Sequence, residues 1–184
     1  AEISKNKSIS IDPGVVNLMT IYNPSGKQRI IKGNTIQNIN NYYNGAISTA
    51  QCKNDIKRNS EIKQKGKTKI PQLTKRIMGL WIKRDHVINN YLNNVVSTMC
   101  DEYKNKKLMI LGYNKGWKNS VHMGKDTNRR FVYIPYASLF SKLEDKLNDK
   151  KKVLVKINES YTSKCDALAL EPICRHDKYD GKRY

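Results

Sequence analysis

Three short β-type runs open the chain before any helical pattern begins. Apolar and β-branched residues fill Ser8–Asp12, Val16–Tyr22 and Gln28–Lys32, and the turn sequence Asn23-Pro24-Ser25-Gly26 separates the second run from the third. These runs predict one strand followed by a meander of two more. The chain should therefore build a sheet that starts with three antiparallel strands.

Helical and strand-like segments alternate in the rest of the chain. Apolar residues recur every three to four positions between residues 71 and 103, which predicts one long amphipathic helix. Leu108–Leu111 and Val153–Ile157 have the pattern of strands, and Tyr136–Leu147 that of a second helix. The order βββ-α-β-α-β is that of the ribonuclease H-like fold, an α/β fold with a five-stranded mixed sheet and flanking helices. In that fold the first, fourth and fifth strands are parallel neighbours.

The segment from residue 34 to residue 70 fits this order poorly. It is polar, rich in asparagine and lysine, and only weakly periodic. We expect a basic, partly flexible insertion here, with a helical start at most. The insertion would belong to a single domain that spans residues 1–184 and lacks its C-terminal end.

Charge points to a polyanionic partner. Lysine and arginine number 35 against 16 aspartate and glutamate residues, which gives a formal net charge of +19. Such an excess is expected of a protein that binds a phosphate backbone, and a basic surface kept only for solubility is the alternative. The sequence has neither a run of apolar residues long enough for a membrane span nor the apolar region of a signal peptide. We therefore expect an intracellular protein with no membrane partner.

Two carboxylates stand where predicted strands end. Asp12 closes the first run, Glu159 follows the last, and Gly112 ends the strand expected between them. Ligands of α/β sheets bind at the carboxyl ends of parallel strands, and carboxylates are the ligands that Mg²⁺ prefers. A two-metal Mg²⁺ site for phosphodiester hydrolysis is the leading hypothesis, with Mn²⁺ as the alternative metal. Asp12 could instead be a turn acid before Pro13-Gly14, and Glu159 a solvated acid at a strand end.

Longer motifs carry a family resemblance. The segments ISIDPGVVNLMTIY, NNYYN, LGYNKGWKNSVHMGKDTNRRFVYIPY and NESYTSKCDALALEPICRHDKYDGKRY resemble the RuvC-like nuclease domain of the TnpB and Fanzor proteins, which are transposon-encoded RNA-guided DNA endonucleases. The chain is most similar to the eukaryotic and large-virus branch. The resemblance implies DNA and guide RNA as partners. It also implies Asp12 as the first metal ligand and Glu159 as a second ligand that replaces the glutamate of the central strand.

The resemblance also implies that the chain is the larger part of a nuclease domain rather than a whole enzyme. The third catalytic aspartate of the family follows the KYDGKR segment, and the sequence stops at Tyr184 before reaching it. With two acids the chain alone should bind nucleic acid but cut it poorly or not at all. A catalytically inactive nucleic-acid-binding remnant and a DNA-strand transposase are the alternative functions. The nucleus or a viral factory is the expected location in a eukaryotic or viral setting, and the cytoplasm otherwise.

Further residues are candidates for nucleic-acid binding because basic and hydroxyl groups contact phosphates and aromatic rings stack on bases. They follow the fourth strand or border Glu159, and packing under a loop or a solvated loop is the alternative for each group. The candidates are Asn114, Lys115, Trp117, Lys118, Lys125, Arg129, Arg130, Tyr161, Thr162, Ser163 and Lys164.

The cysteines give no strong metal signal. Cys52, Cys100, Cys165 and Cys174 are widely spaced, and the chain has no CxxC pair. Reduced thiols are expected, and a structural zinc site is not. A site formed by Cys165, Cys174 and His176 is conceivable from the spacing alone.

Overall fold

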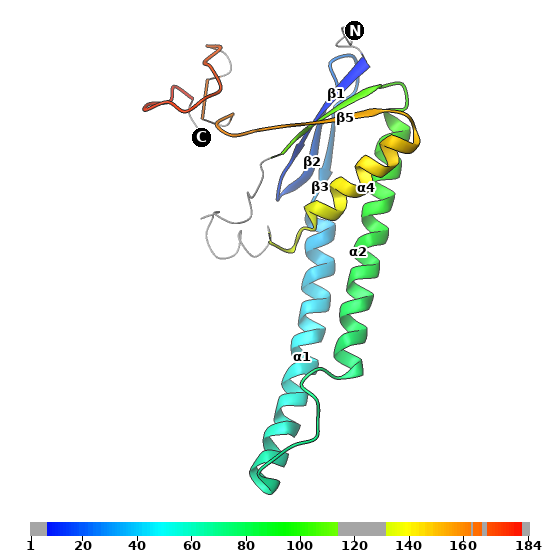
Figure 1. Cartoon of the computed structure of the whole chain (residues 1–184), viewed down its shortest axis with the longest axis vertical. Coiled ribbons are helices and arrows are strands. Elements are labelled where there is room, and N and C mark those ends of the chain that lie inside the picture. The colour runs from blue at the N-terminus through cyan, green and yellow to red at the C-terminus, as the bar shows by residue number, and fades with distance from the viewer. Residues whose placement is uncertain (1–6, 114–131, 163, 167–168, 182–184) are drawn as a thin grey trace.

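The protein is described by a computed structural model over residues 7–113, 132–162, 164–166 and 169–181. Its centre is a five-stranded sheet with the order β3-β2-β1-β4-β5 (Figure 1). The strands are β1 (Ser8–Pro13), β2 (Asn17–Tyr22), β3 (Arg29–Lys32), β4 (Leu108–Gly112) and β5 (Val153–Ile157). The first three strands pair antiparallel, and β4 pairs parallel with both β1 and β5. The fold expected from the order of the elements is confirmed.

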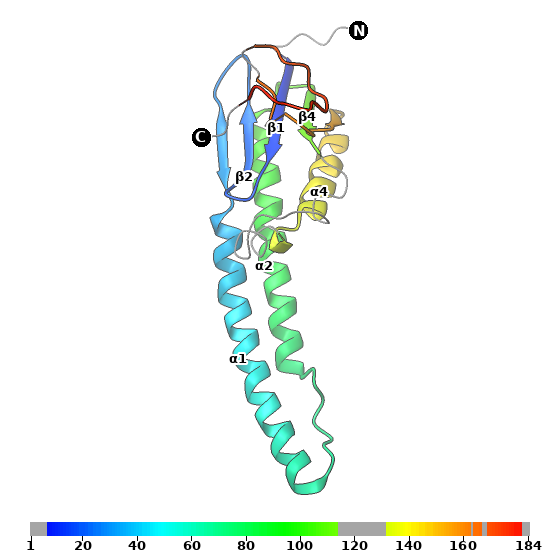
Figure 2. The same cartoon turned by 90° about the vertical axis from the view of Figure 1, so that its left-hand side faces the viewer.

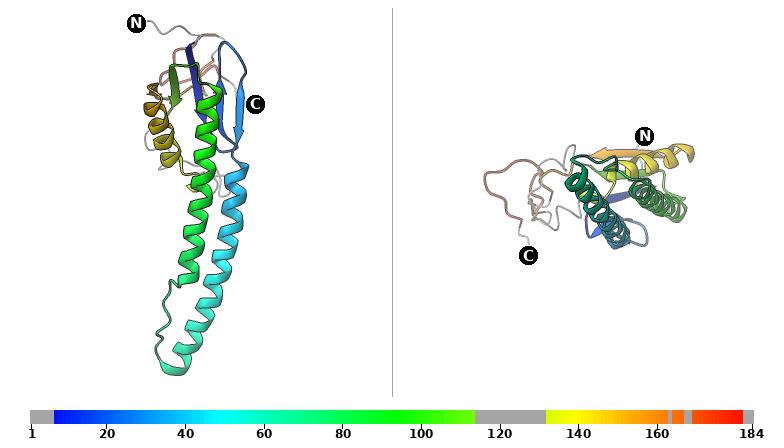
Figure 3. Two further views of the ribbon diagram at one scale, coloured as in Figure 1. Left: turned by 90° about the vertical axis from the view of Figure 1, so that its right-hand side faces the viewer. Right: turned by 90° about the horizontal axis from the view of Figure 1, so that it is seen from below.

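Alternation along the strands separates the two faces of the sheet. Ile9 and Ile11 of β1 are buried, whereas Ser10 and Asp12 between and after them are exposed. The buried face meets two helices, α2 (Lys75–Glu102) and α4 (Tyr136–Asp149), as Figure 3 shows. The core between them includes Met19, Ile21, Met109, Leu111, Leu92, Val96, Met99, Leu139, Leu143 and Leu147.

The long helix predicted between residues 71 and 103 is confirmed as α2. Thr74 caps its first turn, because the Thr74 side-chain oxygen accepts a hydrogen bond from the backbone N–H of Ile77 at 3.3 Å. The C-terminal half packs on the sheet through residues such as Leu92 and Met99. The N-terminal half runs beyond the sheet beside a second long helix (Figures 1 and 2).

That second helix, α1 (Asn34–Lys65), replaces the partly flexible insertion expected over residues 34–70. Its buried side chains are Ile36, Asn40, Ile47 and Asn54, so asparagines hold half of the buried positions. Because asparagine is polar, a search for apolar periodicity does not recognise this stripe. The helix ends at Gly66, whose φ of 67° is a left-handed conformation that glycine adopts without strain.

Together α1, the connection 66–74 and the N-terminal half of α2 form a helical arm that projects from the sheet (Figure 2). Buried Ile47 and Ile77 lie within the arm. The Asn54 side-chain N–H₂ group donates hydrogen bonds to the carbonyls of Pro71 at 2.9 Å and Gln72 at 3.1 Å, and Arg58 donates to the carbonyl of Ile70 at 2.5 Å. These bonds fasten the connection to α1.

No helix within the described ranges is long and apolar enough to cross a bilayer.

Replacing Asn54 by alanine should therefore loosen the end of the arm. Alanine favours the helix, but it leaves the carbonyls of Pro71 and Gln72 without their donor. We expect trypsin to cut at Lys67 and Lys69 several times faster, with little change in the global unfolding midpoint. Limited proteolysis beside thermal unfolding measures both. Asn59→Ala, an exposed change on the same helix, is the control, and equal cleavage rates in the two variants would contradict the prediction.

Candidate active site

Asp12 lies at the carboxyl edge of the sheet on its open face. Ile11 of β1 pairs with Leu111 of β4, so the next residues, Asp12 and Gly112, are neighbours across the two strands. Neighbouring strands are about 4.8 Å apart. A side chain from the end of β5 can therefore reach the space beside Asp12.

Glu159 occupies that space. Ile157, the last residue of β5, pairs with Gly112, and Glu159 follows two residues later. A Cβ atom placed on Gly112 would overlap the carboxylate of Glu159 and would lie 2.6 Å from its Cγ. The carboxylate of Glu159 thus occupies the space that a side chain at position 112 would need. Glycine at position 112 leaves this space open for the carboxylate.

A short turn fixes the backbone around Glu159. Its carbonyl accepts a hydrogen bond from the Thr162 hydroxyl at 2.9 Å and another from the Thr162 N–H at 3.3 Å. The Asn158 side chain accepts from the N–H of Ser160 at 2.8 Å. Tyr161 has a positive φ of 71°, which lets the chain reverse direction directly after the glutamate. The turn directs Glu159 back over β4.

Burial acts on both carboxyls, and the charge of Asp12 also acts on Glu159. Burial, and to a smaller extent the nearby charge of Asp12, together raise the pKa of Glu159 to about 7. Burial also raises the pKa of Asp12, although the residue as a whole is exposed. A carboxyl pair that disfavours its own ionisation in this way is typical of catalytic sites and of cation sites.

Tyr136 supports the site from the core side, and no sequence pattern indicates this role. Its hydroxyl donates a 2.6 Å hydrogen bond to the carbonyl of Gly14, two residues after Asp12. Burial raises the pKa of Tyr136 above its usual range, and the charge of Asp12 adds to the effect. The residue begins α4 and is otherwise buried, so an apolar pattern accounts for it equally well. Its contact with Gly14 requires the tertiary fold.

The pair has the chemistry of a divalent-cation site. Both donors are carboxylates, the hard oxygen ligands that Mg²⁺ and Mn²⁺ prefer. The space over Gly112 is shaped for the Glu159 carboxylate, and a cation between the acids would offset the repulsion that raises the pKa of Glu159. Asp12 and Glu159 therefore fit the metal that the sequence suggested.

The other candidates divide into two groups. Asn114, Lys115, Trp117, Lys118, Lys125, Arg129, Arg130 and Ser163 lie outside the described residues. Tyr161, Thr162 and Lys164 are all exposed beside Glu159. Tyr161 stacks on Tyr179 with 6.2 Å between ring centroids, and the Lys164 ammonium lies 5.2 Å from the Tyr179 ring. Their roles in nucleic-acid binding remain predictions.

Comparisons with known proteins agree with this architecture. The family model OrfB_IS605, described as "Probable transposase", matches residues 2–115. No curated protein matches the chain. A solved Cas12f1-sgRNA-target DNA complex contains a chain that is 16% identical and superposes with a TM-score of 0.58, over 90% of this chain and 39% of that one. A CRISPR-Cas12f ternary complex contains a chain that is 17% identical and superposes with a TM-score of 0.62, over 86% of this chain and 30% of that one. This chain thus spans less than half the length of the matched Cas12f chain in either structure.

The raised pKa of Glu159 predicts how stability depends on pH in metal-free protein. In the folded state this carboxyl keeps its proton up to about pH 7, whereas the ordinary pKa of a glutamate is 4.5. The folded state therefore binds more protons than the unfolded state in this window, and stability falls as the pH rises from about 4.5 to about 7. Glu159→Gln should make the fall smaller.

Thermal unfolding across this range with EDTA present measures the effect. Asp145→Asn, an exposed change on α4, is the control for the loss of one negative charge. A pH profile of Glu159→Gln that matches the profile of this control would show that the fold does not raise the pKa of Glu159.

Proposed function

Because the chain belongs to the OrfB_IS605 family of probable transposases, the TnpB family, we propose that it forms the larger part of a RuvC-like nuclease domain in an RNA-guided DNA endonuclease. The proposed reaction is metal-dependent hydrolysis of DNA phosphodiester bonds. The fold shared with the two Cas12f structures supports this, since one of them is a complex with sgRNA and target DNA and the other is a ternary complex. The net charge of +19 suits both polyanions.

The observation that carries the proposal is the position of Glu159 over Gly112. The middle one of the three parallel strands, β4, ends at Gly112 without an acid, and the segment after the neighbouring strand β5 supplies one at the same place. Glu159 is half-buried against the neighbouring strand, and it lies close enough to Asp12 for the charge of that residue to raise its pKa. The arrangement is understandable as a ligand pair.

In this proposal Asp12 and Glu159 hold Mg²⁺, with Mn²⁺ as the alternative. Bound there, the metal would supply a Lewis acid for the scissile phosphate and lower the pKa of a bound water. Glu159 gives up its proton when it becomes a ligand. Tyr136 holds the carbonyl of Gly14 and so keeps the backbone after Asp12 in place. The third acid that the family resemblance implies would complete the set from outside residues 1–184.

The finer assignments belong to the same proposal. A second carboxylate at position 159, with glycine at position 112, supports the eukaryotic and large-virus branch of the family. The protein would then act in a nucleus or a viral factory, where guide RNA and DNA are both present. Tyr161, Thr162 and Lys164 would contact the nucleic acid next to the acid pair.

Neutralising either acid should separate cutting from binding. In the full natural protein loaded with guide RNA, Asp12→Asn and Glu159→Gln should each lower the rate of DNA cleavage at least about a hundredfold, because each removes a metal ligand. DNA affinity should change by less than about threefold. Rapid-quench cleavage and filter binding measure the two quantities. Asp145→Asn should cut normally, and cleavage at the normal rate by either site variant would refute the metal assignment.

A carboxylate exchange between the strands tests the geometry directly. Gly112→Ala should reduce cleavage about as far as Glu159→Gln, since its Cβ needs the space of the Glu159 carboxylate. The double variant Gly112→Glu with Glu159→Ala moves the acid to β4 and empties that space. We expect this double variant to cleave DNA at least about tenfold faster than Gly112→Ala does.

Circular dichroism and thermal unfolding should show that these variants are folded. The double variant Gly112→Ala with Glu159→Ala is the matched control, because it relieves the overlap without restoring an acid. Equal rates for the control and the exchange variant would mean that position 112 does not substitute for position 159.

A further inference from the structure

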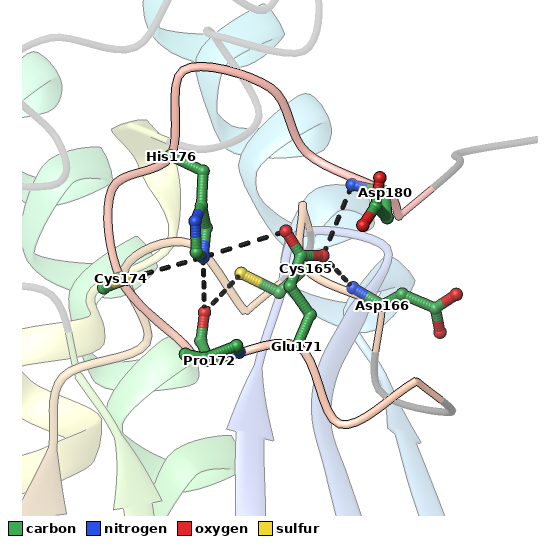
Figure 4. A network of polar contacts seen from close by, with 7 residues as sticks. All are labelled: Cys165, Asp166, Glu171, Pro172, Cys174, His176 and Asp180. Carbon is green, nitrogen blue, oxygen red and sulfur yellow. Dashed lines mark hydrogen bonds and ion pairs between the residues drawn. The ribbon is translucent and has the colours of Figure 1, made fainter.

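Residues 164–181 follow the turn after Glu159 and contain no helix or strand in their described part. A cluster of side chains and backbone groups holds this segment together (Figure 4). The cluster contains Cys165, Glu171, Cys174 and His176, which are spread over twelve positions of the sequence. Folding thus brings together residues whose spacing alone did not favour a zinc site.

The ligand-type atoms of this cluster lie close to one another. The Cys165 sulfur, a carboxylate oxygen of Glu171 and a ring nitrogen of His176 are all within 4.8 Å of one another. Nε2 of His176 is 3.7 Å from Oε1 of Glu171 and 3.4 Å from the sulfur of Cys174. In a tetrahedral zinc site with bonds of about 2.0–2.3 Å, neighbouring ligand atoms are roughly 3.3–3.8 Å apart. A small contraction would bring these three atoms to that geometry, and the sulfur of Cys174, which is close to His176 but outside this group of three, would have to move toward Cys165 and Glu171.

Glu171 is held as metal-bound carboxylates are. Its Oε2 accepts hydrogen bonds from the backbone N–H groups of Asp166 at 2.6 Å and of Asp180 at 3.3 Å, while Oε1 faces His176 (Figure 4). Its side chain is only 8% exposed. One oxygen is thus fixed by the backbone and the other is presented to the cluster. Such support from outside the ligand shell orients ligands and tunes metal affinity.

We propose that Cys165, Glu171, Cys174 and His176 bind a structural Zn²⁺. Cysteine sulfur, histidine nitrogen and carboxylate oxygen are the ligands that zinc takes in proteins. On binding, both thiols lose their protons and His176 keeps its remaining proton on Nδ1. The contacts of Cys165 and His176 with the carbonyl of Pro172, at 3.4 Å and 2.7 Å, are replaced by bonds to the metal.

The proposed zinc site adjoins the turn that carries Glu159. His176 packs edge-on against Tyr179 with 5.4 Å between ring centroids, and Tyr179 stacks on Tyr161, two residues after Glu159. The metal would therefore hold residues 165–180 as one unit against this turn. The proposal does not depend on the nuclease activity, because it concerns sulfur and nitrogen ligands outside the acid pair.

Metal binding by the reduced, tag-free chain tests the proposal. We expect one Zn²⁺ per chain to bind with a dissociation constant below about 10⁻⁷ M in competition with a chromophoric chelator. Cobalt at the same site should show a sulfur-to-cobalt charge-transfer band and the intense visible bands of a tetrahedral ion. The double variant Asp12→Asn with Glu159→Gln should keep both bands, because those acids provide only oxygen.

Substitutions identify the ligands. Cys165→Ser, His176→Ala and Glu171→Gln should each weaken zinc binding at least about a hundredfold, and Cys174→Ser should about halve the charge-transfer band. Cys52→Ser and His86→Ala, two exposed changes on the helices, are the matched controls and should bind normally. Glu171→Gln keeps an oxygen for the backbone N–H groups, so it tests the site without removing those hydrogen bonds.

Three results would overturn the zinc site as a whole, and a fourth would overturn its four-ligand form. They are the absence of stoichiometric zinc binding, a cobalt complex of the wild-type chain without the sulfur band, and wild-type affinity in Cys165→Ser or His176→Ala. A full-strength band in Cys174→Ser would remove Cys174 from the ligand set and overturn the four-ligand site.

Discussion

Parallel pairing of β1, β4 and β5 is the constraint on which the site depends. It brings the carboxyl ends of three strands from distant parts of the sequence to one edge of the sheet. The register then decides what meets there, because Asp12 falls beside Gly112 and Ile157 falls opposite Gly112. A shift of one residue would turn Asp12 into the core and move Glu159 away from the glycine. The hydrophobic contacts of β1 and β4 with α2 and α4 hold that register in place.

The same arrangement has an energetic cost in the absence of a cation. Asp12 and Glu159 are partly removed from water, which raises the pKa of both, and the charge of Asp12 makes ionisation of Glu159 less favourable still. A cation bound between the two acids would offset both effects.

The strands and two of the helices were predictable because their patterns are local. Alternation in β1 and the apolar spacing of α2 and α4 identify those elements within a few residues. The helix α1 was not predictable in this way, since Asn40 and Asn54 occupy its buried stripe. Glu159 was identified by its place after a strand, whereas the roles of Tyr136 and Glu171 arise from contacts that only the fold creates. Strand order thus indicates the edge of the sheet where the two acids lie, but not the groups that support them.

The length of the helical arm can change without a change in the sheet. The buried positions Ile36, Asn40, Ile47 and Asn54 recur at steps of four and seven residues along α1, which is 32 residues or about 48 Å long. Inserting or deleting seven residues in each helix would keep this stripe on one side and change the reach of the arm by roughly 10 Å. Other lengths would rotate the stripe by about 100° per residue and break the pairing with α2. Length variation in relatives should therefore occur in whole heptads, with the edge that carries Asp12 undisturbed.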